Sequence, residues 1–339
     1  MLNKTKYQDS KFIFVVGIGG SNLASKAVWN ALTSHKLEKD KKIFFLESPE
    51  EREYKEIEIL INNKILNPNE LVLVVISKSG KTVETLETFK KISKILEKKF
   101  SNSFNERTLI ISTKDSPLWQ EAEERNMECV EWEGNIGGRF SAFTIAHTAI
   151  LSIAGLDTEA FINGKEKTEK ECVKENNENP AKHLAQEIFN YHKKGFDILD
   201  FFIFNSELED LGKWCRQLIA ESLATLTPTV SIGPTDLHSM LELYLGGPKN
   251  RFTIFVKSLK EIAGSINNEA FENVSTAYKK AGLPFIKYEM EEINEQELGS
   301  FMAFMMRVVI ELAELLKIDP HDQPAVEAYK KQLVNDNQN

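Results

Sequence analysis

The chain has 339 residues, of which 42% are hydrophobic and 27% are charged, and its formal net charge is −9. This length allows one large or two ordinary globular domains with a buried core. The acidic balance argues against a nucleic-acid or membrane-surface function, although a local group of amides and basic side chains can still bind a small anion.

The cysteines and the apolar runs of the sequence indicate in which cellular compartment the protein resides. Cys129, Cys172 and Cys215 are far apart and none belongs to a CxxC pair, so we expect neither a disulfide framework nor a metal site. The first residues lack the apolar core of a signal peptide, and the longest apolar runs, such as residues 71–76, are too short to span a bilayer. We therefore expect a cytoplasmic protein in a reducing setting, with no membrane partner.

In the first half, short runs rich in β-branched and aromatic residues alternate with amphipathic stretches. The predicted strands are residues 12–16, 42–46, 71–76 and 108–112. The predicted helices are residues 21–32, 51–62, 82–100 and 118–125. This alternation predicts a parallel sheet covered by helices on both faces.

A strongly charged segment separates the two halves. Residues 165–179 contain almost no apolar side chains, which is typical of a solvated linker or an exposed helix. We therefore predict a first domain at residues 1–160, a second at residues 161–318 with a charged linker at about 161–180, and a C-terminal helical tail at residues 319–339.

The second half repeats the alternation. Strands are predicted at residues 200–204, 251–256 and 284–288, and helices at 207–223, 236–244, 267–281 and 295–316, with a short final helix near 322–333. The helix at 295–316 is apolar on most faces, so we expect it to be buried. The predicted fold is α/β, with two tandem three-layer α/β/α sandwich domains, mainly parallel sheets and a C-terminal helix.

Two loops after predicted strands carry anion-binding chemistry. The glycine turn, residues 17–21 (GIGGS), offers close backbone approach and free N–H groups at a helix start, although a plain tight turn would look similar. A dinucleotide fingerprint needs glycine where Asn22 stands, so that alternative fails. The hydroxyl loop, residues 77–82 (SKSGKT), provides hydroxyls, ammonium groups and backbone donors at a strand end, where α/β sheets bind ligands. A phosphate is the natural ligand, and the alternative is a solvated turn.

These loops, with four further segments in order, resemble phosphosugar isomerases, most closely the glucose-6-phosphate isomerase family. The six segments are GIGGS (17–21), SKSGKT (77–82), GGRFS (137–141), Gln217 with Glu221, GPTDLHSMLEL (233–243) and DQPAVEAYK (322–330). Together they cover nearly the whole chain. The resemblance implies that Gly20, Ser21, Ser77, Lys78, Ser79, Thr82, Gln217 and Gln323 bind substrate, mainly its phosphate.

The resemblance also assigns catalytic roles. Gln217 and Glu221 are four apart on a predicted helix and so share one face. A shielded carboxylate suits proton transfer between C2 and C1, and the resemblance makes Glu221 that base. The arginine turn, residues 137–141, carries Arg139, which the resemblance assigns to the enediolate. Taken alone, Glu221 is one acid among many and Arg139 could be an ordinary ion-pair partner.

Ring opening is assigned to two further residues. His238 follows Thr235, which we predict to be a helix N-cap, and an imidazole there can transfer a proton to the ring oxygen. We also predict Asp322 to be an N-cap, with Gln323 and Lys330 about two turns apart on one face. The resemblance implies that Lys330 assists ring opening and that the partner subunit of a homodimer supplies His238. Without the resemblance, His238 would be interpreted as a structural histidine and Lys330 as a solvent-exposed lysine.

Several features depart from the family pattern. Family members usually carry a helical segment ahead of the first strand, which here begins near Lys11. The stretches from Glu221 to His238 and from His238 to Lys330 are short. Lys81 stands where relatives usually have threonine, Ala325 where they have glycine, and His321 where an aromatic residue is common.

The sequence therefore predicts the interconversion of glucose 6-phosphate and fructose 6-phosphate through a cis-enediol, a step of glycolysis and gluconeogenesis, with no metal and no cofactor. One alternative is a related isomerase that also accepts mannose 6-phosphate. A second is a phosphosugar sensor without turnover, which retention of Glu221, Arg139, His238 and Lys330 argues against. A nucleotide-dependent oxidoreductase is the third, and Asn22 counts against it.

Overall fold

The computed structural model describes residues 4–48, 50–172 and 179–326. The chain divides into two compact units. The first unit runs to Asn163 and includes Ile293–Gly299; the second comprises Gly164–Glu292 and the chain from Ser300 onward. Each unit holds one parallel sheet with its own helices, which confirms the predicted α/β class.

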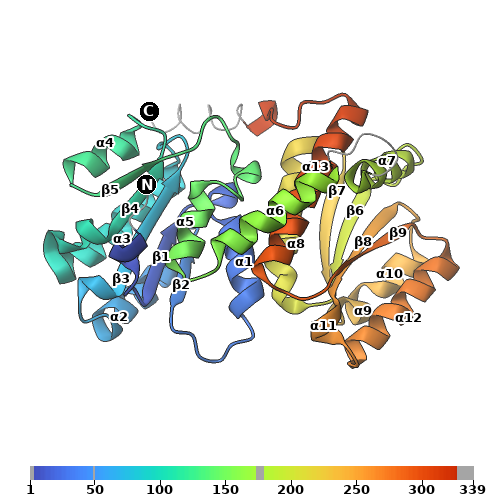
Figure 1. Ribbon diagram of the computed structural model, residues 1–339, viewed down its shortest axis with the longest axis horizontal. Coiled ribbons are helices and arrows are strands. Elements are labelled where there is room, and N and C mark those ends of the chain that lie inside the picture. Colours follow the sequence, from blue (N-terminus) through green and yellow to red (C-terminus); the bar gives the residue numbers. More distant parts are fainter. Residues whose placement is uncertain (1–3, 49, 173–178, 327–339) are drawn as a thin grey trace. The chain divides into compact units, whose positions relative to one another are not determined.

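The first unit contains a five-stranded sheet in the order β2-β1-β3-β4-β5, and all of its pairings are parallel. The strands are β1 (Phe12–Val16), β2 (Lys42–Leu46), β3 (Leu71–Ser77), β4 (Thr108–Ser112) and β5 (Glu128–Glu131). Its helices are α1 (Leu23–Thr33), α2 (Glu51–Lys64), α3 (Val83–Phe100), α4 (Pro117–Glu124) and α5 (Ile145–Ile153), joined by short 3₁₀ turns. The four strands predicted here are confirmed (Figure 1).

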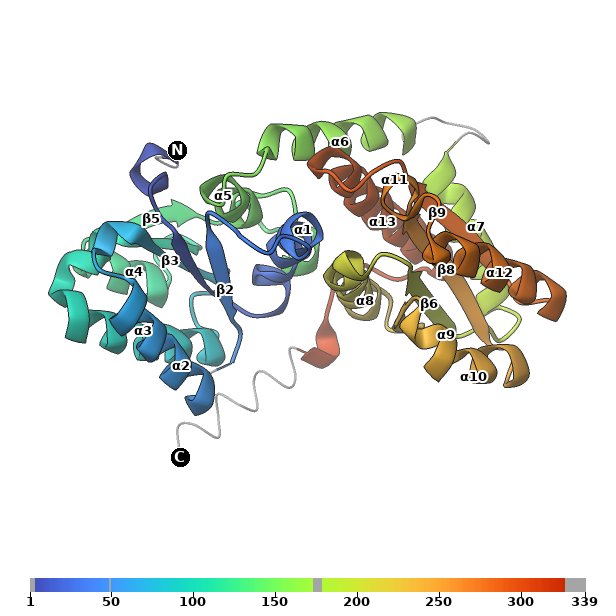
Figure 2. The ribbon, with the colours of Figure 1, turned by 90° about the horizontal axis from the view of Figure 1, so that it is seen from below.

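Two apolar clusters make this unit a three-layer sandwich. On one face, Phe14 and Leu73 pack with side chains of α2, α3 and α4, including Phe89. On the other face, Val15 and its neighbours pack with α1 and α5 through residues such as Trp29. Alternate residues of one strand point to opposite faces, so an all-apolar strand is what burial on both sides requires. Figure 2 shows α5 and α2 on opposite sides of the sheet.

The second unit has a four-stranded parallel sheet in the order β7-β6-β8-β9. Its strands are β6 (Ile198–Ile203), β7 (Thr227–Ile232), β8 (Arg251–Ser258) and β9 (Phe285–Met290). Its helices are α7 (Pro180–His192), α8 (Glu209–Leu223), α9 (Thr235–Ser239), α10 (Leu241–Gly246), α11 (Leu259–Ile262), α12 (Ile266–Ala281) and most of α13 (Glu295–Leu316). Helix α6 (Thr158–Cys172) begins in the first unit and ends in the second.

The two faces of the second sheet are covered differently. Phe202, Phe204 and Phe255 form an aromatic cluster with side chains of α10 and α12. On the opposite face α8 approaches closely because Gly212 has no side chain: a Cβ there would lie 2.8 Å from Val230 and 3.3 Å from Ile203. The burial predicted for α13 is confirmed along most of its length.

Some expectations were wrong in detail. Strands β5 and β7 were not predicted, because both are edge strands with polar residues and partial exposure. The single helix expected at residues 236–244 is two short helices that meet at Met240. Of the two alternatives for residues 165–179, a solvated linker or an exposed helix, the structure shows a helix as far as Cys172, as part of α6, and this helix buries Thr168 and Cys172.

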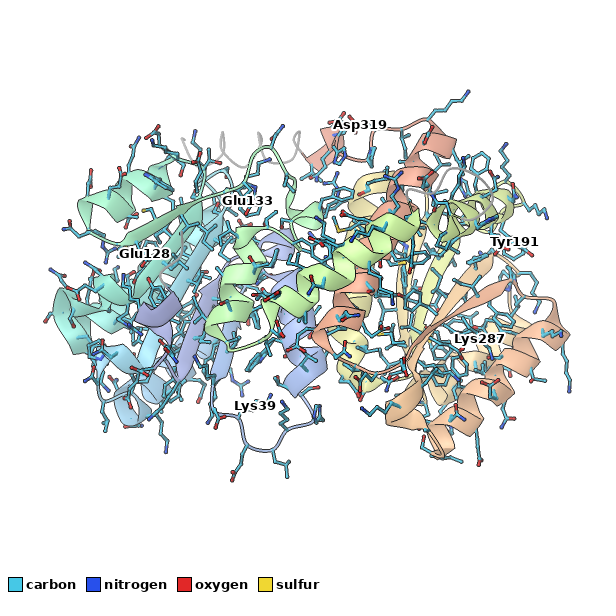
Figure 3. All side chains as sticks on the ribbon, viewed as in Figure 1. Lys39, Glu128, Glu133, Tyr191, Lys287 and Asp319 are labelled. Atoms are coloured by element: carbon cyan, nitrogen blue, oxygen red, sulfur yellow. The ribbon has the colours of Figure 1, made fainter. Side chains whose placement is uncertain are left out.

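Polar contacts tie surface segments to the edges of both sheets. In the first unit, Glu128 on β5 accepts hydrogen bonds from Lys6 and Tyr7, each at 2.8 Å, and so anchors the first described turn. In the second unit, Lys287 on β9 pairs with Glu272 of α12 at 2.8 Å. Figure 3 labels Glu128 and Lys287.

Across the described ranges, no helix combines the length and the apolar character that a membrane crossing would need.

Candidate active site

The glycine turn connects β1 to α1 and lies against the arginine turn. Gly20 is the point of contact, because a Cβ at this position would lie 2.4 Å from the carbonyl carbon of Gly138 and 2.7 Å from the nitrogen of Arg139. Only glycine permits this approach without displacing backbone. The two turns, far apart in sequence, are therefore packed backbone to backbone at the carboxyl end of the first sheet.

The hydroxyl loop lies at the end of β3, the neighbour of β1. Ser77 Oγ and Thr82 Oγ1 are 3.0 Å apart and hydrogen-bonded, which closes the loop across its ends. Gly80 has φ +62° and faces Ser116, so both its conformation and the available space require glycine. Ser112, at the end of β4, donates to the Ser77 carbonyl at 2.6 Å. The loop thus has a fixed shape before any ligand binds.

Lys78 links the hydroxyl loop to the segment that precedes the arginine turn. Its Nζ donates to Asn135 Oδ1 at 2.8 Å, and partial burial lowers the pKa of the Lys78 ammonium. Ser79 is exposed, and its Oγ accepts the N–H of Lys81 at 3.2 Å. The candidate residues of the first unit therefore lie on three loops: the glycine turn contacts the arginine turn, and Lys78 joins the hydroxyl loop to Asn135, just before the arginine turn.

Arg139 supplies a buried positive charge beside these loops. Its side chain is only 2% exposed, and the guanidinium carbon lies 5.5 Å from the centre of the Phe140 ring. The residue lies in a 3₁₀ turn, Gly138–Phe140, that ends before α5. A guanidinium held by packing and turned from bulk water can stabilise developing negative charge without reorganising at the moment of reaction.

Sequence reasoning missed one buried polar residue in this region, His147 on α5. Its Nδ1 accepts the N–H of Ser25 at 3.1 Å, and its Nε2 lies 3.0 Å from both the Gly20 carbonyl and Ser141 Oγ. Burial lowers the pKa of His147 to about 4, so the ring is neutral at physiological pH. The available signal was a histidine in a mainly apolar segment, residues 145–153, since a buried imidazole needs hydrogen-bond partners.

In the second unit, Gln217, Glu221 and Gln323 lie together. Gln217 Nε2 donates to one carboxylate oxygen of Glu221 at 2.6 Å, and Gln323 Nε2 donates to the other at 3.3 Å. Helix α8 holds the first two residues one turn apart, while Gln323 comes from the segment after α13. Gln217 Oε1 is buried and accepts no hydrogen bond from the residues that the structure describes. The carboxylate is thus oriented by two amides, next to an acceptor suited to a hydroxyl donor.

His238 lies apart from this group, exposed on α9. The predicted N-cap at Thr235 was wrong: Pro234 precedes the helix without a side-chain cap, and Asp236 instead accepts the N–H of Ile232 at 2.6 Å. The predicted N-cap at Asp322 was also wrong, because the helical turn begins at Pro324, directly after Gln323. Lys330 lies outside the described residues.

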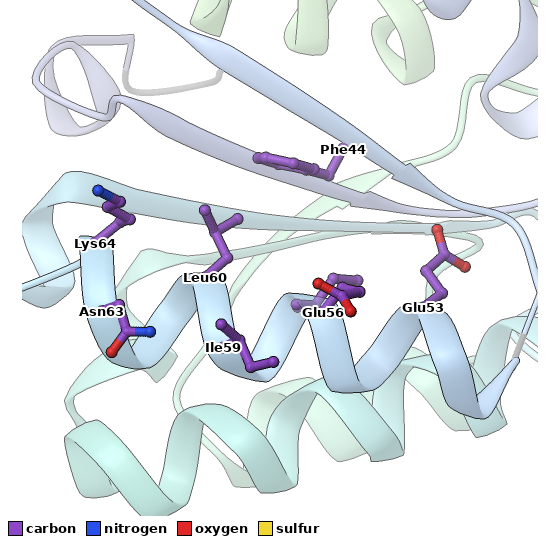
Figure 4. A pocket seen from close by; sticks show the side chains of 8 residues that line it. Phe44, Glu53, Glu56, Ile59, Leu60, Asn63 and Lys64 are labelled. Atoms are coloured by element: carbon purple, nitrogen blue, oxygen red, sulfur yellow. The ribbon is translucent and has the colours of Figure 1, made fainter.

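Surface grooves also occur away from these residues. One groove of about 440 Å³ lies between β2 and α2, where Phe44, Leu60 and Ile59 line it with Glu53 and Glu56 (Figure 4). None of the candidate residues lines this groove. The candidate residues are therefore recognised by their chemistry: N–H, hydroxyl and ammonium donors in the first unit, and a carboxylate oriented by two amides in the second.

The architecture defines the class of protein. A solved structure of a hypothetical protein from Thermus thermophilus superposes with a TM-score of 0.88 at 22% identity, covering 98% of this chain and 86% of that one. A glucose-6-phosphate isomerase from Chlamydia trachomatis superposes with a TM-score of 0.84 at 18% identity, covering 97% of this chain and 70% of that one. The chain thus shares the fold of these two proteins.

Sequence similarity then gives the family. The phosphoglucose isomerase family model matches residues 5–228. The glucose-6-phosphate isomerase of Methanocaldococcus jannaschii is 32% identical over 94% of this chain and 82% of its own length. This chain belongs to the phosphoglucose isomerase family.

Proposed function

We propose that this protein is an aldose–ketose isomerase that interconverts glucose 6-phosphate and fructose 6-phosphate, the activity for which its relatives are named. The observation that carries the proposal is the Glu221 carboxylate, which two glutamine amides hold in one orientation. Isomerisation requires one base that removes a proton from C2 and returns it to C1, and a positioned carboxylate is suited to this.

The proton transfer follows from that geometry. Glu221 takes the C2 proton of the open-chain aldose, electrons move to the carbonyl oxygen O1, and O1 takes up a proton to give a cis-enediol. The same carboxyl then returns its proton to C1 while the C2 hydroxyl gives up its proton, so that overall one proton moves from C2 to C1 and one from O2 to O1, without net redox change. The buried Gln217 Oε1, an acceptor, is placed to receive a substrate hydroxyl, while Gln217 and Gln323 amides can also donate to phosphate.

The first unit supplies substrate binding and charge stabilisation. We assign Gly20, Ser21, Ser77, Lys78, Ser79 and Thr82 to substrate binding, mainly through N–H, hydroxyl and ammonium donors to the phosphate. Arg139 stabilises the enediolate oxygen with a guanidinium that is already buried and fixed. Binding energy on the phosphate then holds the reacting carbons in place.

Ring opening and assembly complete the proposal. His238 and Lys330 open the sugar ring by proton transfer at the ring oxygen, and His238 serves the active site of a second subunit in a homodimer. Exposure of His238 on α9 supports its contribution to a partner. We further propose a cytoplasmic enzyme, with domains at residues 1–160 and 161–318 and a tail from residue 319 that completes the site.

The test is a coupled assay in which purified protein receives fructose 6-phosphate and glucose 6-phosphate is measured. Turnover is expected, and in deuterated water the product should carry deuterium at C2, because a base exchanges its proton with solvent whereas a hydride transfer does not. Binding of the sugar phosphate without conversion would contradict the proposal. A parallel reaction with mannose 6-phosphate measures substrate breadth.

A further inference from the structure

His147 occupies a position from which it contacts two substrate-handling turns at once. Its Nδ1 accepts the N–H of Ser25, so the ring proton is on Nε2. That Nε2–H points at the Gly20 carbonyl and at Ser141 Oγ, each 3.0 Å away. The ring therefore joins α1, the glycine turn and the arginine turn through a single neutral side chain.

Ser141 extends this link within the arginine turn. Its hydroxyl donates to the Gly138 carbonyl at 2.6 Å and lies 3.2 Å from the Gly20 carbonyl. Gly20 and Gly138 are the two residues whose backbones touch. The hydrogen bonds made by His147 Nε2 and by Ser141 thus act at the contact between the turns, and that contact sets where Arg139 lies relative to Gly20 and Ser21.

We propose that His147 is a positioning residue for the isomerase reaction: its Nε2–H locks the glycine turn to the arginine turn, so that the substrate-binding backbone of Gly20 and the guanidinium of Arg139 keep one fixed separation. The role requires no contact with substrate. It rests on the proposed isomerase function for its kinetic consequence, but the lock itself exists in the protein without substrate.

The neutral ring is essential to this role. An imidazolium has no acceptor, so protonation would oppose two N–H groups, those of Nδ1 and Ser25. Burial of the whole side chain disfavours the charged form, and the low pKa of His147 is consistent with a permanently neutral hydrogen-bonding spacer. An aliphatic residue would fill the space but leave the Gly20 carbonyl with only the longer contact to Ser141.

Two substitutions separate the functions of the two ring nitrogens. In His147→Asn, the amide oxygen can replace Nδ1 as acceptor for Ser25, but nothing reaches Gly20. In His147→Gln, the longer side chain can place an N–H donor near the position of Nε2. The control is Thr148→Val on the same helix, where the hydroxyl donates to the carbonyl of Thr144, the residue just before α5, at 3.0 Å.

The experiment measures steady-state kinetics with fructose 6-phosphate and, on the same proteins without substrate, amide hydrogen exchange in residues 18–21 and 137–141. We expect His147→Asn to raise KM about tenfold and to accelerate exchange in both turns, as expected for a lost hydrogen bond at their contact. His147→Gln should restore most of both properties, and Thr148→Val should match wild type.

Two results would overturn the inference: equal KM and equal exchange in wild type and His147→Asn, or a loss confined to the amount of folded protein, which lowers apparent kcat and leaves KM unchanged. If wild type itself does not isomerise fructose 6-phosphate, the proposed function fails. The exchange rates still decide the inference in that case, because they report the contact between the turns independently of turnover.

Discussion

The two sheets share a strand order but differ in the chemistry at their carboxyl ends. In each unit the first strand lies between the second and the third, as in β2-β1-β3-β4 and β7-β6-β8-β9. After β1 the chain makes a glycine turn that touches a second backbone. After β6 the corresponding position holds Asn205, whose Oδ1 accepts the N–H of Ser258 at 2.8 Å. The strand end that carries a glycine turn in the first unit is thus tied by an asparagine side chain in the second.

The sheet interiors differ as well. Strands β1 and β3 of the first unit are apolar along their buried lengths, up to Ser77. Strand β6 carries Asp200 at its centre, fully buried, with Arg251 at 3.3 Å and hydrogen bonds from Ser231 and Thr229. Burial raises the pKa of Asp200 despite these partners. The second unit therefore holds an ion pair within its sheet, whereas the central strands β1 and β3 of the first unit are apolar up to Ser77.

The largest expected effect is a loss of kcat on removing the proposed base, Glu221, and it tests whether the second unit carries the proton transfer. Glu221→Gln keeps the shape of the side chain but removes the base, so kcat should fall about 10³-fold. The measurement is the coupled assay with fructose 6-phosphate. Glu209→Gln on the same helix is the matched control, since Glu209 pairs at the surface with Lys213. Turnover that survives in Glu221→Gln would remove Glu221 from the role of base.

The sequence predicted those strands and helices that leave a clear pattern in their own residues, and it missed those that do not. Apolar runs located β1, β3 and β4, which are almost entirely buried, and also the edge strand β2, which is partly exposed. The edge strands β5 and β7 lack such a run, since Pro228 and polar neighbours are tolerated where pairing is on one side only. The break at Met240 was missed for a similar reason: the apolar pattern continued across it.

For the candidate site residues, too, contacts within one helix could be predicted and contacts between distant parts of the chain could not. The spacing of Gln217 and Glu221 indicated a shared helix face, and the two side chains are hydrogen-bonded. The contacts of Gln323 and His147 could not be predicted, because their partners are separated from them by about a hundred residues. Such contacts depend on how the elements pack, and a local sequence pattern carries no information about packing partners.

The second prediction concerns the buried ion pair. Arg251→Met should leave Asp200 buried without its cation and lower the free energy of unfolding by about 3 kcal/mol. Urea titration followed by Trp214 fluorescence is suitable, because Trp214 is the one tryptophan in the sequence of the second unit. Arg216→Met, at an exposed position of α8, is the control and should change stability by less than about 0.5 kcal/mol.

A double variant sharpens this test. When Asp200→Asn is added to Arg251→Met, part of the lost stability should return, because the uncompensated charge is removed along with its partner. Equal stability of Arg251→Met and wild type would mean that the ion pair contributes nothing to the stability of the second unit.

The third prediction addresses the backbone contact of the first unit. In Gly20→Ala, the new Cβ would lie 2.4 Å from Gly138, so the two turns must separate. A displacement of substrate-holding groups on this scale should lower kcat/KM about 30-fold while circular dichroism remains unchanged. Gly246→Ala in the second unit is the control, since its Cβ would meet only Glu242 at 3.4 Å. Unchanged kcat/KM would show that the contact is not needed for catalysis.

The smallest effect appears as a pH dependence of stability. Burial lowers the pKa of His147 to about 4, whereas the unfolded value is about 6.5, so the unfolded chain binds the proton first as pH falls. The stabilising contribution is complete above about pH 6.5 and declines from there through pH 4; at pH 5 the loss is about 2 kcal/mol. Urea titrations at pH 7 and pH 5 compare wild type with His147→Gln, whose side chain at position 147 cannot titrate. Because both proteins share the same carboxylates, the difference between their pH dependences gives the contribution of His147. A loss of stability between pH 7 and pH 5 that is the same in both proteins would mean that the ring is accessible to protons in the folded state, and that the contact between the glycine turn and the arginine turn does not depend on a neutral imidazole.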